Sequence, residues 1–336
     1  MDKNNESSRD VDFYLNSAAK PTEKGGDETQ LTSLSQIKGY LEKGTPPNTR
    51  KSYQYDWNHF CDNGGELPAS PEAVANYLVR FATTLNPRTL RRRLSAIGAW
   101  HNLRGLPNPV KVALVQKLMS GIEHVHGRPR KKAAPLDLND IKAITESLLA
   151  KDTLKAKRDR ALILLMYFAV MRRSEVSALN MEHIEFLPEG LVVLFPKSKT
   201  DQKGEGETCA IPVYPDEALC PVRALITWRQ ASGIYEGAVF VPITKYDTIH
   251  SGAHGRLSPD RIDIIIKSLA KAVGLTQADK ISSHSCRRGF TTSSARKGTP
   301  LHVLQRHGRW KHPKTVIGYI EAGRQFEDNA AKALFE

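Results

Sequence analysis

Residues 159–176, with the sequence DRALILLMYFAVMRRSEV, place a long apolar run directly before a pair of arginines. The run from Ala161 to Met171 is too short to cross a membrane, which takes about 20 apolar residues. An apolar run of this length predicts a helix buried in a domain core, which we expect over 155–170. Arg172 then follows that helix, where a cation ordinarily does no more than complement the helix dipole.

Downstream of this helix the sequence predicts a small antiparallel sheet followed by more helices. Short strands are expected at 184–186, 191–195 and 209–213. A turn joins the first two strands, and the polar, glycine-containing segment 197–207 is expected to be a hairpin loop between the last two. Prolines and capping side chains predict further helix starts near Pro221, Ser258-Pro259, His284, Thr299-Pro300 and Pro313.

Upstream, the region 31–127 has helical periodicity. Its predicted helices begin with capping residues or prolines, at Asn48, Ser70-Pro71, Asn86-Pro87 and Pro109. In the third helix, Leu90, Leu94 and Ile97 form the apolar stripe. The expected fold class is mainly α with a small antiparallel β-sheet, in which an α-helical domain precedes a mixed α/β domain.

The charge of the chain favours a polyanionic partner. The formal net charge is +13 and the pI is near 9.5, and from 37 to 136 there are 16 Lys and Arg against six Asp and Glu. Arg88, Arg91 and Arg92 form a basic stripe with no interleaved acid, so a bound phosphate backbone would offset their repulsion. A solvated helix face is the alternative interpretation.

The remaining segments complete the predicted domain organisation. Polar residues 1–30 predict a disordered tail, followed by the helical domain at 31–127. Segment 128–136, RPRKKAAPL, predicts a linker. Its basic residues Arg128, Arg130, Lys131 and Lys132 either contact DNA as the chain wraps around it or only keep a hinge soluble. The second domain is expected at 137–325, and 326–336 has helical spacing.

Other features restrict the class of protein. The N-terminus lacks the apolar core of a signal peptide, and the four cysteines have no disulfide-like or C-x-x-C spacing. Histidines occur at 302, 307 and 312, but no cysteine or carboxylate cluster accompanies them. We therefore expect a cytoplasmic protein with no membrane segment and no metal site, and one that is nucleoid-associated if the polyanionic partner is DNA.

An ordered set of polar and aromatic residues in the last 170 positions suggests phosphodiester chemistry: Arg172, Lys199, His284, Arg287, Trp310 and Tyr319. Fixed cations lower the barrier to attack on a phosphodiester, because charge builds on its oxygens in the transition state. Arginine forks hold two phosphate oxygens at once. His284 and Arg287, three apart, would share one helix face, and a tyrosine hydroxyl can attack the phosphorus.

These residues lie in motifs that resemble the tyrosine recombinase (phage integrase) family, which includes Cre and the Xer recombinases. Met171–Val176 resembles its first-arginine box and His284–Arg287 its His-x-x-Arg box. Gly308–Trp310 with Gly318-Tyr319 resembles its terminal box, with tryptophan where many members have histidine. Val170 stands where many members have a small residue, and we expect it to alter how the long helix ends. The helical region upstream is similar to the family's core-binding domain.

The resemblance implies a site-specific DNA recombinase that needs no cofactor and conserves bond energy in a 3′-phosphotyrosine. Tyr319 would be the nucleophile. Lys199 would be the general acid for the 5′-oxygen, with Lys197 and Lys203 as rivals, and Trp310 would donate its indole N–H to a phosphate oxygen. His284 would either bind a phosphate oxygen or accept the tyrosine proton. Glu175 would orient the site, unless it only forms a helix-surface ion pair.

The resemblance also implies partners: double-stranded DNA with an inverted-repeat site, and a homotetramer that exchanges strands through a Holliday junction, typically for a mobile element. The segment 326–336 would dock into a neighbouring protomer, or else pack on its own domain. Three alternatives share the fold or the chemistry: a topoisomerase of the IB kind, a telomere resolvase, and a DNA-binding regulator without catalysis.

Overall fold

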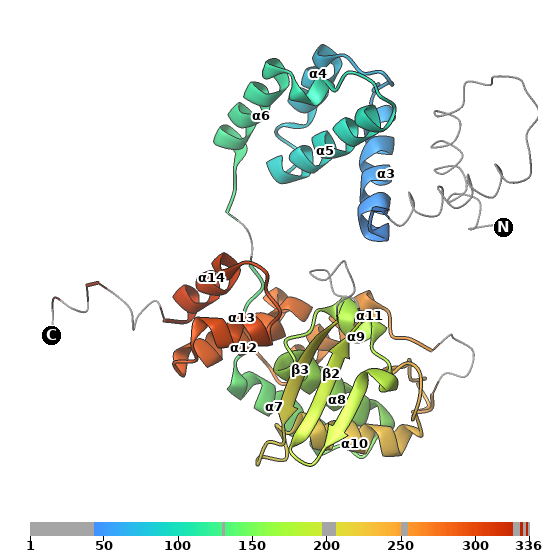
Figure 1. Ribbon diagram of the computed structural model, residues 1–336, viewed down its shortest axis with the longest axis vertical. Coiled ribbons are helices and arrows are strands. Elements are labelled where there is room, and N and C mark those ends of the chain that lie inside the picture. Colours follow the sequence, from blue (N-terminus) through green and yellow to red (C-terminus); the bar gives the residue numbers. More distant parts are fainter. Residues whose placement is uncertain are drawn as a thin grey trace, which may run out of the picture. The chain divides into compact units, whose positions relative to one another are not determined.

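The computed structural model describes residues 44–129, 132–196, 206–249 and 255–324, with 330, 331 and 334. The chain divides into two compact units, residues 1–130 and 131–336 (Figure 1). The fold class predicted from the sequence is confirmed, since helices predominate and the strands form one three-stranded antiparallel sheet. The predicted tail at 1–30 and most of 326–336 lie outside the described residues.

The described part of the first unit consists of helices α3 (Pro47–Cys61), α4 (Pro71–Phe81), α5 (Pro87–Leu103) and α6 (Ala113–His126), with a 3-10 turn η1 (Pro109–Lys111). The Ser70 and Asn86 side chains accept hydrogen bonds from the first turns of α4 and α5. The prediction that Asn48 caps α3 is wrong. The helix already begins at Pro47, because proline in the first turn loses no hydrogen bond there.

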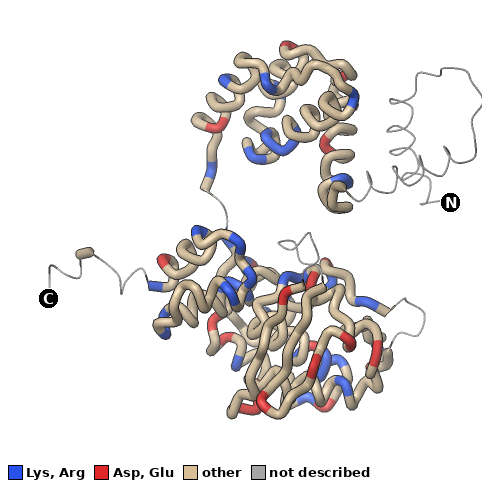
Figure 2. The backbone as a smooth tube through the Cα atoms, viewed as in Figure 1, with Lys and Arg blue, Asp and Glu red and all other residues tan. Residues whose placement is uncertain are grey.

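One apolar core holds this unit together. The predicted stripe on α5 is confirmed, since Leu90, Leu94 and Ile97 are at most 2% exposed. Helix α3 packs against α5 and α4 packs against α6. Each helix contributes to the same cluster, which includes Phe60, Leu78 and Met119. Charged residues are spread over all of these helices (Figure 2), and Asp56 and Arg93 are the charged residues buried among them.

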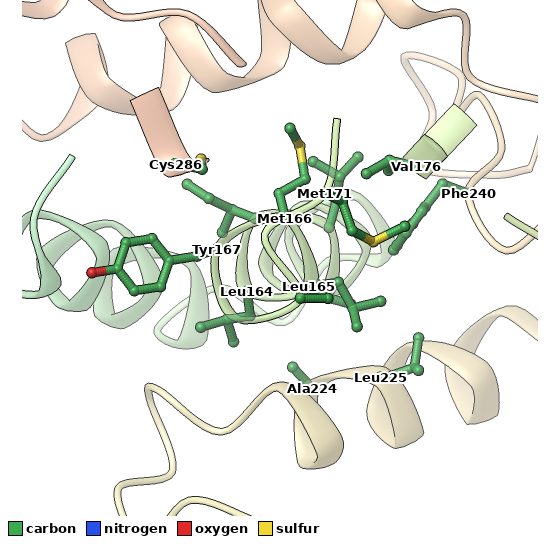
Figure 3. Packing of buried hydrophobic residues seen from close by; sticks show 14 of the residues in the cluster. Leu164, Leu165, Met166, Tyr167, Met171, Val176, Ala224, Leu225, Phe240 and Cys286 are labelled. Carbon is green, nitrogen blue, oxygen red and sulfur yellow. The ribbon is translucent and has the colours of Figure 1, made fainter. Parts of the chain in front are cut away.

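The second unit is built around the apolar helix predicted from the sequence, α8 (Leu154–Phe168). Every side chain from Arg158 to Tyr167 is buried, as expected for a helix whose second half is apolar on all faces. Figure 3 shows Leu164, Leu165, Met166 and Tyr167 projecting from it toward the surrounding elements. Helices α7 (Leu138–Leu149), α10 (Pro221–Ser232) and α12 (Ser283–Arg296) all pack against α8.

The sheet has the strand order β1-β2-β3, with strands β1 (Ile184–Leu187), β2 (Gly190–Phe195) and β3 (Glu207–Pro212). Both pairings are antiparallel, and Leu187 opposite Gly190 closes the turn between the first two strands. Inward side chains such as Leu191, Val193 and Phe195 join the core around α8. The strand predictions are therefore confirmed to within two residues at each end.

The other elements of this unit are mostly short: α9 (Arg173–Ala178), η2 (Met181–His183), α11 (Pro259–Ala272), η3 (Ala278–Lys280), α13 (Leu301–His307) and α14 (Pro313–Arg324). Helix α14 packs against α12 and α13 (Figure 1). Among the described residues, no helix is long and apolar enough to cross a membrane.

Part of the segment predicted as a linker is firmly packed in the second unit. The backbone N–H groups of Ala134 and Leu136 donate to Lys280 and Ser285, and Leu136 is fully buried. Gly289 on α12 allows this close approach, because a Cβ there would lie 1.5 Å from the carbonyl oxygen of Leu136. The end of the predicted linker thus helps to fix α12, which carries two of the candidate site residues.

Candidate active site

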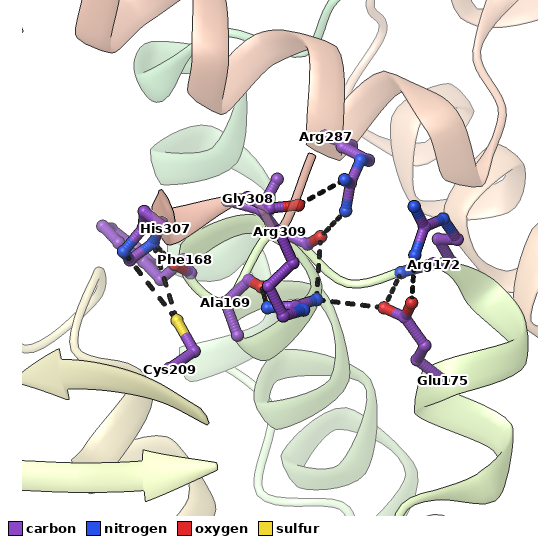
Figure 4. A network of polar contacts seen from close by, with 10 residues as sticks. Phe168, Ala169, Arg172, Glu175, Cys209, Arg287, His307, Gly308 and Arg309 are labelled. Atoms are coloured by element: carbon purple, nitrogen blue, oxygen red, sulfur yellow. Dashed lines mark hydrogen bonds and ion pairs between the residues drawn. The ribbon is translucent and has the colours of Figure 1, made fainter. Parts of the chain in front are cut away.

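The C-terminal end of α8 provides three backbone carbonyl groups that cationic or aromatic side chains satisfy. His307 Nε2 lies 2.6 Å from the Phe168 oxygen, Arg309 Nη1 donates to Ala169 at 3.0 Å, and Arg287 Nη1 donates to Val170 (Figure 4). The last carbonyls of a helix have no partner within it and carry partial negative charge. Side chains from α12 and α13 therefore fasten these elements to the end of the buried helix.

Val170 turns the chain sharply at this point. Its φ is +50°, in the left-handed region that a β-branched residue rarely adopts, and its side chain is fully buried. This conformation ends α8 and directs the chain into α9. That valine alters the helix end relative to a small residue stays a prediction, and the strained conformation is held by the surrounding contacts.

Arg172 and Glu175 are paired at the start of α9. The Glu175 carboxylate accepts the backbone N–H of Arg172 at 2.8 Å and its Nη1 at 2.5 Å. The Glu175 side chain is only 6% exposed, whereas that of Arg172 is 18% exposed. Glu175 is therefore a buried anchor, not an ion pair on the helix surface. It leaves part of the Arg172 guanidinium facing solvent.

Helix α12 carries the second arginine and the histidine. The Arg287 guanidinium is buried, donates to the backbone carbonyls of Val170 and Gly308, and lies 4.3 Å from the Trp310 ring centroid. Two of its five N–H groups are used in this way, so three remain for a ligand. His284, one turn earlier, is open to solvent.

The segment from α13 to α14 brings in the aromatic residues. Trp310 and Tyr319 are both half-buried, and their ring centroids are 6.0 Å apart. Gly308 makes room for the indole, because a Cβ at this position would lie 1.7 Å from the Trp310 ring. Trp310 therefore lies in contact range of both Arg287 and Tyr319.

The electrostatics of the site are dominated by positive charge. Helices α12 and α13 contain Lys or Arg but no Asp or Glu (Figure 2). Although the His284 side chain reaches solvent, desolvation by the surrounding protein, followed by the Arg287, Arg173 and Arg172 guanidinium groups, lowers its pKa, so its ring is neutral at neutral pH. Burial, followed by Arg172, lowers the pKa of Arg287 to about 9, which still leaves it charged. An anion would relieve this repulsion.

The structure brings together most of the residues that the sequence predicted. The contacts above join Arg172 to Glu175 and, separately, Arg287 to Trp310 and Trp310 to Tyr319. His284 is close enough to Arg287 and Arg172 for their charges to lower its pKa. Lys199 and its rivals Lys197 and Lys203 lie outside the described residues.

The predicted DNA-binding residues differ among themselves. Arg88, Arg128 and Lys132 are exposed, whereas Arg130 and Lys131 lie outside the described residues. Arg91 pairs with Glu123 at 2.6 Å, and Arg92 forms two hydrogen bonds to Asp56 at 2.7 and 2.9 Å. The stripe has no acid of its own, but neighbouring helices supply two. Phosphate is therefore not required to offset the repulsion.

Sequence reasoning missed Arg309. Its guanidinium is buried, lies 3.6 Å from the Phe195 ring centroid and contacts Glu175 at 3.0 Å. The only signal in the sequence was its position inside the terminal box, which does not distinguish a buried cation from an exposed one.

Residues 135–325, more than half of the chain, match the phage integrase family. The chain belongs to the phage integrase family. A relative of this integrase, the integrase/recombinase xerD homolog of Selenomonas ruminantium, is 35% identical over 305 residues, which cover 88% of this chain and 87% of the relative. The integrase is thus a tyrosine recombinase, as the sequence motifs predicted.

Solved structures agree on the fold of this integrase. The XerH site-specific recombinase bound to palindromic difH substrate aligns with a TM-score of 0.64 at 14% identity, covering 99% of this chain and 90% of that one. The Tn1549 transposon integrase in complex with transposon right end DNA aligns with a TM-score of 0.56 at 14% identity, covering 82% and 89%. At these identities the likeness establishes the architecture alone.

Proposed function

We propose that this protein is a site-specific DNA recombinase that cleaves and rejoins duplex DNA through a 3′-phosphotyrosyl link to Tyr319. The observation that carries the proposal is the contact chain from Tyr319 through Trp310 to Arg287, because it puts a phenol beside a buried cation. The exposed edge of Arg172 is available to the same ligand. The DNA complex of the structurally similar Tn1549 integrase supports DNA as the partner.

In the proposed reaction the Tyr319 oxygen attacks the scissile phosphorus and the bond to the 5′-oxygen breaks. Arg172 and Arg287 would hold the non-bridging oxygens, on which charge builds in the transition state. His284 is suited to accept the phenolic proton or a hydrogen bond, since its lowered pKa keeps the ring neutral. Lys199 would protonate the leaving 5′-oxygen. One ester replaces another, so the free 5′-hydroxyl can reverse the step without ATP.

The wider assembly is part of the proposal. Two inverted half-sites would bind two protomers, and pairing of two such sites would give a tetramer that exchanges strands through a Holliday junction. Arg88, Arg128 and Lys132 are exposed cations suited to the DNA backbone, and Arg130 and Lys131 belong to the same proposed contact. The segment 326–336 would join neighbouring protomers, and the protein would act at the nucleoid, for a mobile element.

A suicide substrate nicked beside the scissile phosphate tests the proposal, because loss of the short fragment that carries the new 5′-hydroxyl traps the covalent intermediate. The wild-type protein should acquire on Tyr319 the mass of the oligonucleotide that ends in the esterified 3′-phosphate, as measured by peptide mass spectrometry. Tyr319→Phe should abolish the adduct without weakening DNA binding. An adduct that persists in Tyr319→Phe would assign another nucleophile.

The same substrates separate the alternatives. Relaxation of a one-site plasmid without recombination of a two-site plasmid would indicate a topoisomerase of the IB kind, and hairpin ends would indicate a telomere resolvase. Sequence-specific binding with no adduct at any time would indicate a regulator without catalysis.

A further inference from the structure

Glu175 is shared between two arginines that lie far apart in the sequence. Its Oε1 accepts Arg172 Nη1 at 2.5 Å, and its Oε2 accepts both the Arg172 backbone N–H at 2.8 Å and Arg309 Nη2 at 3.0 Å (Figure 4). The carboxylate is 6% exposed, so protein groups rather than water must satisfy it. One buried anion therefore connects α9 with the turn after α13.

Arg309 differs from Arg172 in that protein contacts surround it. Its side chain is 2% exposed and its guanidinium lies 3.6 Å from the Phe195 ring centroid. Besides Glu175 it donates to the carbonyls of Ala169 at 3.0 Å and Val170 at 3.5 Å. Three of its five N–H groups are bound to protein acceptors, against two for Arg287, and its guanidinium lies against Phe195. We therefore assign it no phosphate contact, and any effect on the reaction must pass through its neighbours.

We propose that Arg309 is a positioning residue for strand cleavage, which keeps Glu175 ionised and in place so that Arg172 retains a free edge for the scissile phosphate. This inference rests on the proposed function. A carboxylate that lies between two guanidinium groups divides its lone pairs between them. Without Arg309, the buried carboxylate would either take a second N–H from Arg172 or accept a proton, and both changes would disturb Arg172.

Arg309 also holds the turn from which Arg172 emerges. Val170 has a φ of +50° and Arg309 itself a φ of +54°, so both residues adopt left-handed conformations. The Arg309 Nη2 donates to the Val170 carbonyl and so connects them. Such conformations persist only where surrounding contacts impose them. The same guanidinium thus fixes the backbone before Arg172 and the carboxylate that orients its side chain.

Cleavage of the suicide substrate by variants tests this role. Arg309→Met keeps the stem that packs on Phe195 but removes the charge. Single-turnover cleavage at saturating DNA should slow by about 10- to 100-fold, as when groups that orient the ligands of a metal site are removed. DNA affinity should not change. Arg309→Lys should recover part of the rate, because it retains the charge without the fork.

A double-mutant cycle identifies Glu175 as the intermediary. The Glu175→Gln/Arg309→Met variant removes both buried charges, so its loss of rate should be smaller than the product of the two single losses. In this double variant neither Glu175 nor Arg309 is left charged without the other, so it can be measured even if Arg309→Met alone does not fold. Losses that multiply in full would mean that Arg309 acts independently of Glu175, and would overturn the inference.

The pH dependence of stability gives a readout that does not depend on cleavage. Burial alone would raise the pKa of Glu175, but Arg309 and Arg172 hold it below its ordinary value. The ionised carboxylate therefore stabilises the wild-type fold above that range, and this contribution is lost as the pH falls. In Arg309→Met the pKa should rise, so the Tm deficit of this variant should shrink from pH 7.5 to pH 5.

Arg306→Met is the matched control, because it removes an exposed cation from the neighbouring helix α13. Besides burial, Arg309 and Arg306 both contribute to lowering the pKa of His307, so this control measures the pH dependence that comes from His307 alone. If Arg309→Met cleaves at the wild-type rate, or if its Tm deficit varies with pH no more than that of Arg306→Met, the inference is wrong. If the wild type itself forms no adduct, the proposed function fails, whereas the Tm measurement still decides whether Arg309 sets the charge of Glu175.

Discussion

The two units of this recombinase each contain a buried carboxylate shared by two arginines. In the helical unit, Asp56 is fully buried and pairs with Arg92 and Arg93, whose side chains are 49% and 4% exposed. In the catalytic unit, Glu175 pairs with Arg172 and Arg309, at 18% and 2%. Each set therefore has one enclosed cation and one that reaches solvent.

The two sets differ in how the outer arginine is held. Arg92 places both Nε and Nη2 on Asp56, so the edge of its fork is occupied by the acid. Arg172 gives Glu175 only one side-chain nitrogen, together with its backbone N–H. A fork that is used within the fold stabilises it, whereas a fork with a free edge can bind a phosphate. This comparison predicts that Asp56 serves stability, and it supports the catalytic role proposed for Arg172.

Removal of the Asp56 charge should have the largest effect on stability. Asp56→Asn leaves the enclosed Arg93 without a counterion, and breaking a buried pair in this way costs about 3–5 kcal/mol. Urea unfolding followed by tryptophan fluorescence measures this, because Trp57 and Trp100, with ring centroids 5.5 Å apart, report on this unit.

Glu123→Gln is the control for that measurement. It breaks the pair between Glu123 and Arg91, whose side chains are 37% and 45% exposed, and exposed pairs contribute at most about 1 kcal/mol. An equally small loss in Asp56→Asn would mean that Arg93 needs no counterion, and the stabilising role assigned to Asp56 would be wrong.

Removal of the two solvent-reaching arginines, Arg172 and Arg92, should affect different properties: the cleavage rate in the first case and stability in the second. Arg172→Ala should slow cleavage by about 10²–10³-fold, the usual effect of losing one donor to transition-state charge. Arg92→Ala should lower the stability of the helical unit and leave the single-turnover rate at saturating DNA nearly unchanged. Equal losses of rate would show that the free edge of Arg172 is not what distinguishes the two sets.

Local signals in the sequence account for much of the fold. Ser70-Pro71 and Asn86-Pro87 start helices because the cap and the proline act within one turn. The apolar run before Arg172 predicted the central helix, because a helical segment that is apolar on every face must be buried. The turn before Gly190 and the polar, glycine-containing segment 197–207 likewise separated the three predicted strands.

The ion pairs that shape the two sites were not predictable. Asp56 and Arg92 are 36 residues apart, and Glu175 and Arg309 are 134 apart. No periodic pattern connects such positions, so only the packing of helices reveals which acid meets which arginine. Motif order predicted Arg172, Arg287, Trp310 and Tyr319, because their chemistry is visible in residue type. Arg309 was not predicted, because an arginine in the sequence gives no indication that its side chain is buried.

The smallest expected effect concerns the outer face of α5. Among the described residues Arg88 is exposed and has no ion pair, whereas Glu123 already offsets the charge of its neighbour Arg91. If this face binds the DNA backbone, Arg88→Gln should reduce the slope of log affinity against log salt by about 1. Arg91→Gln should reduce it by less, since forming a phosphate contact must first break the pair with Glu123. Fluorescence anisotropy with a labelled duplex over a salt series measures both slopes. Equal slopes for the wild type and Arg88→Gln would identify this stripe as a solvated helix face, and the DNA contacts of the helical unit would then have to come from other cations.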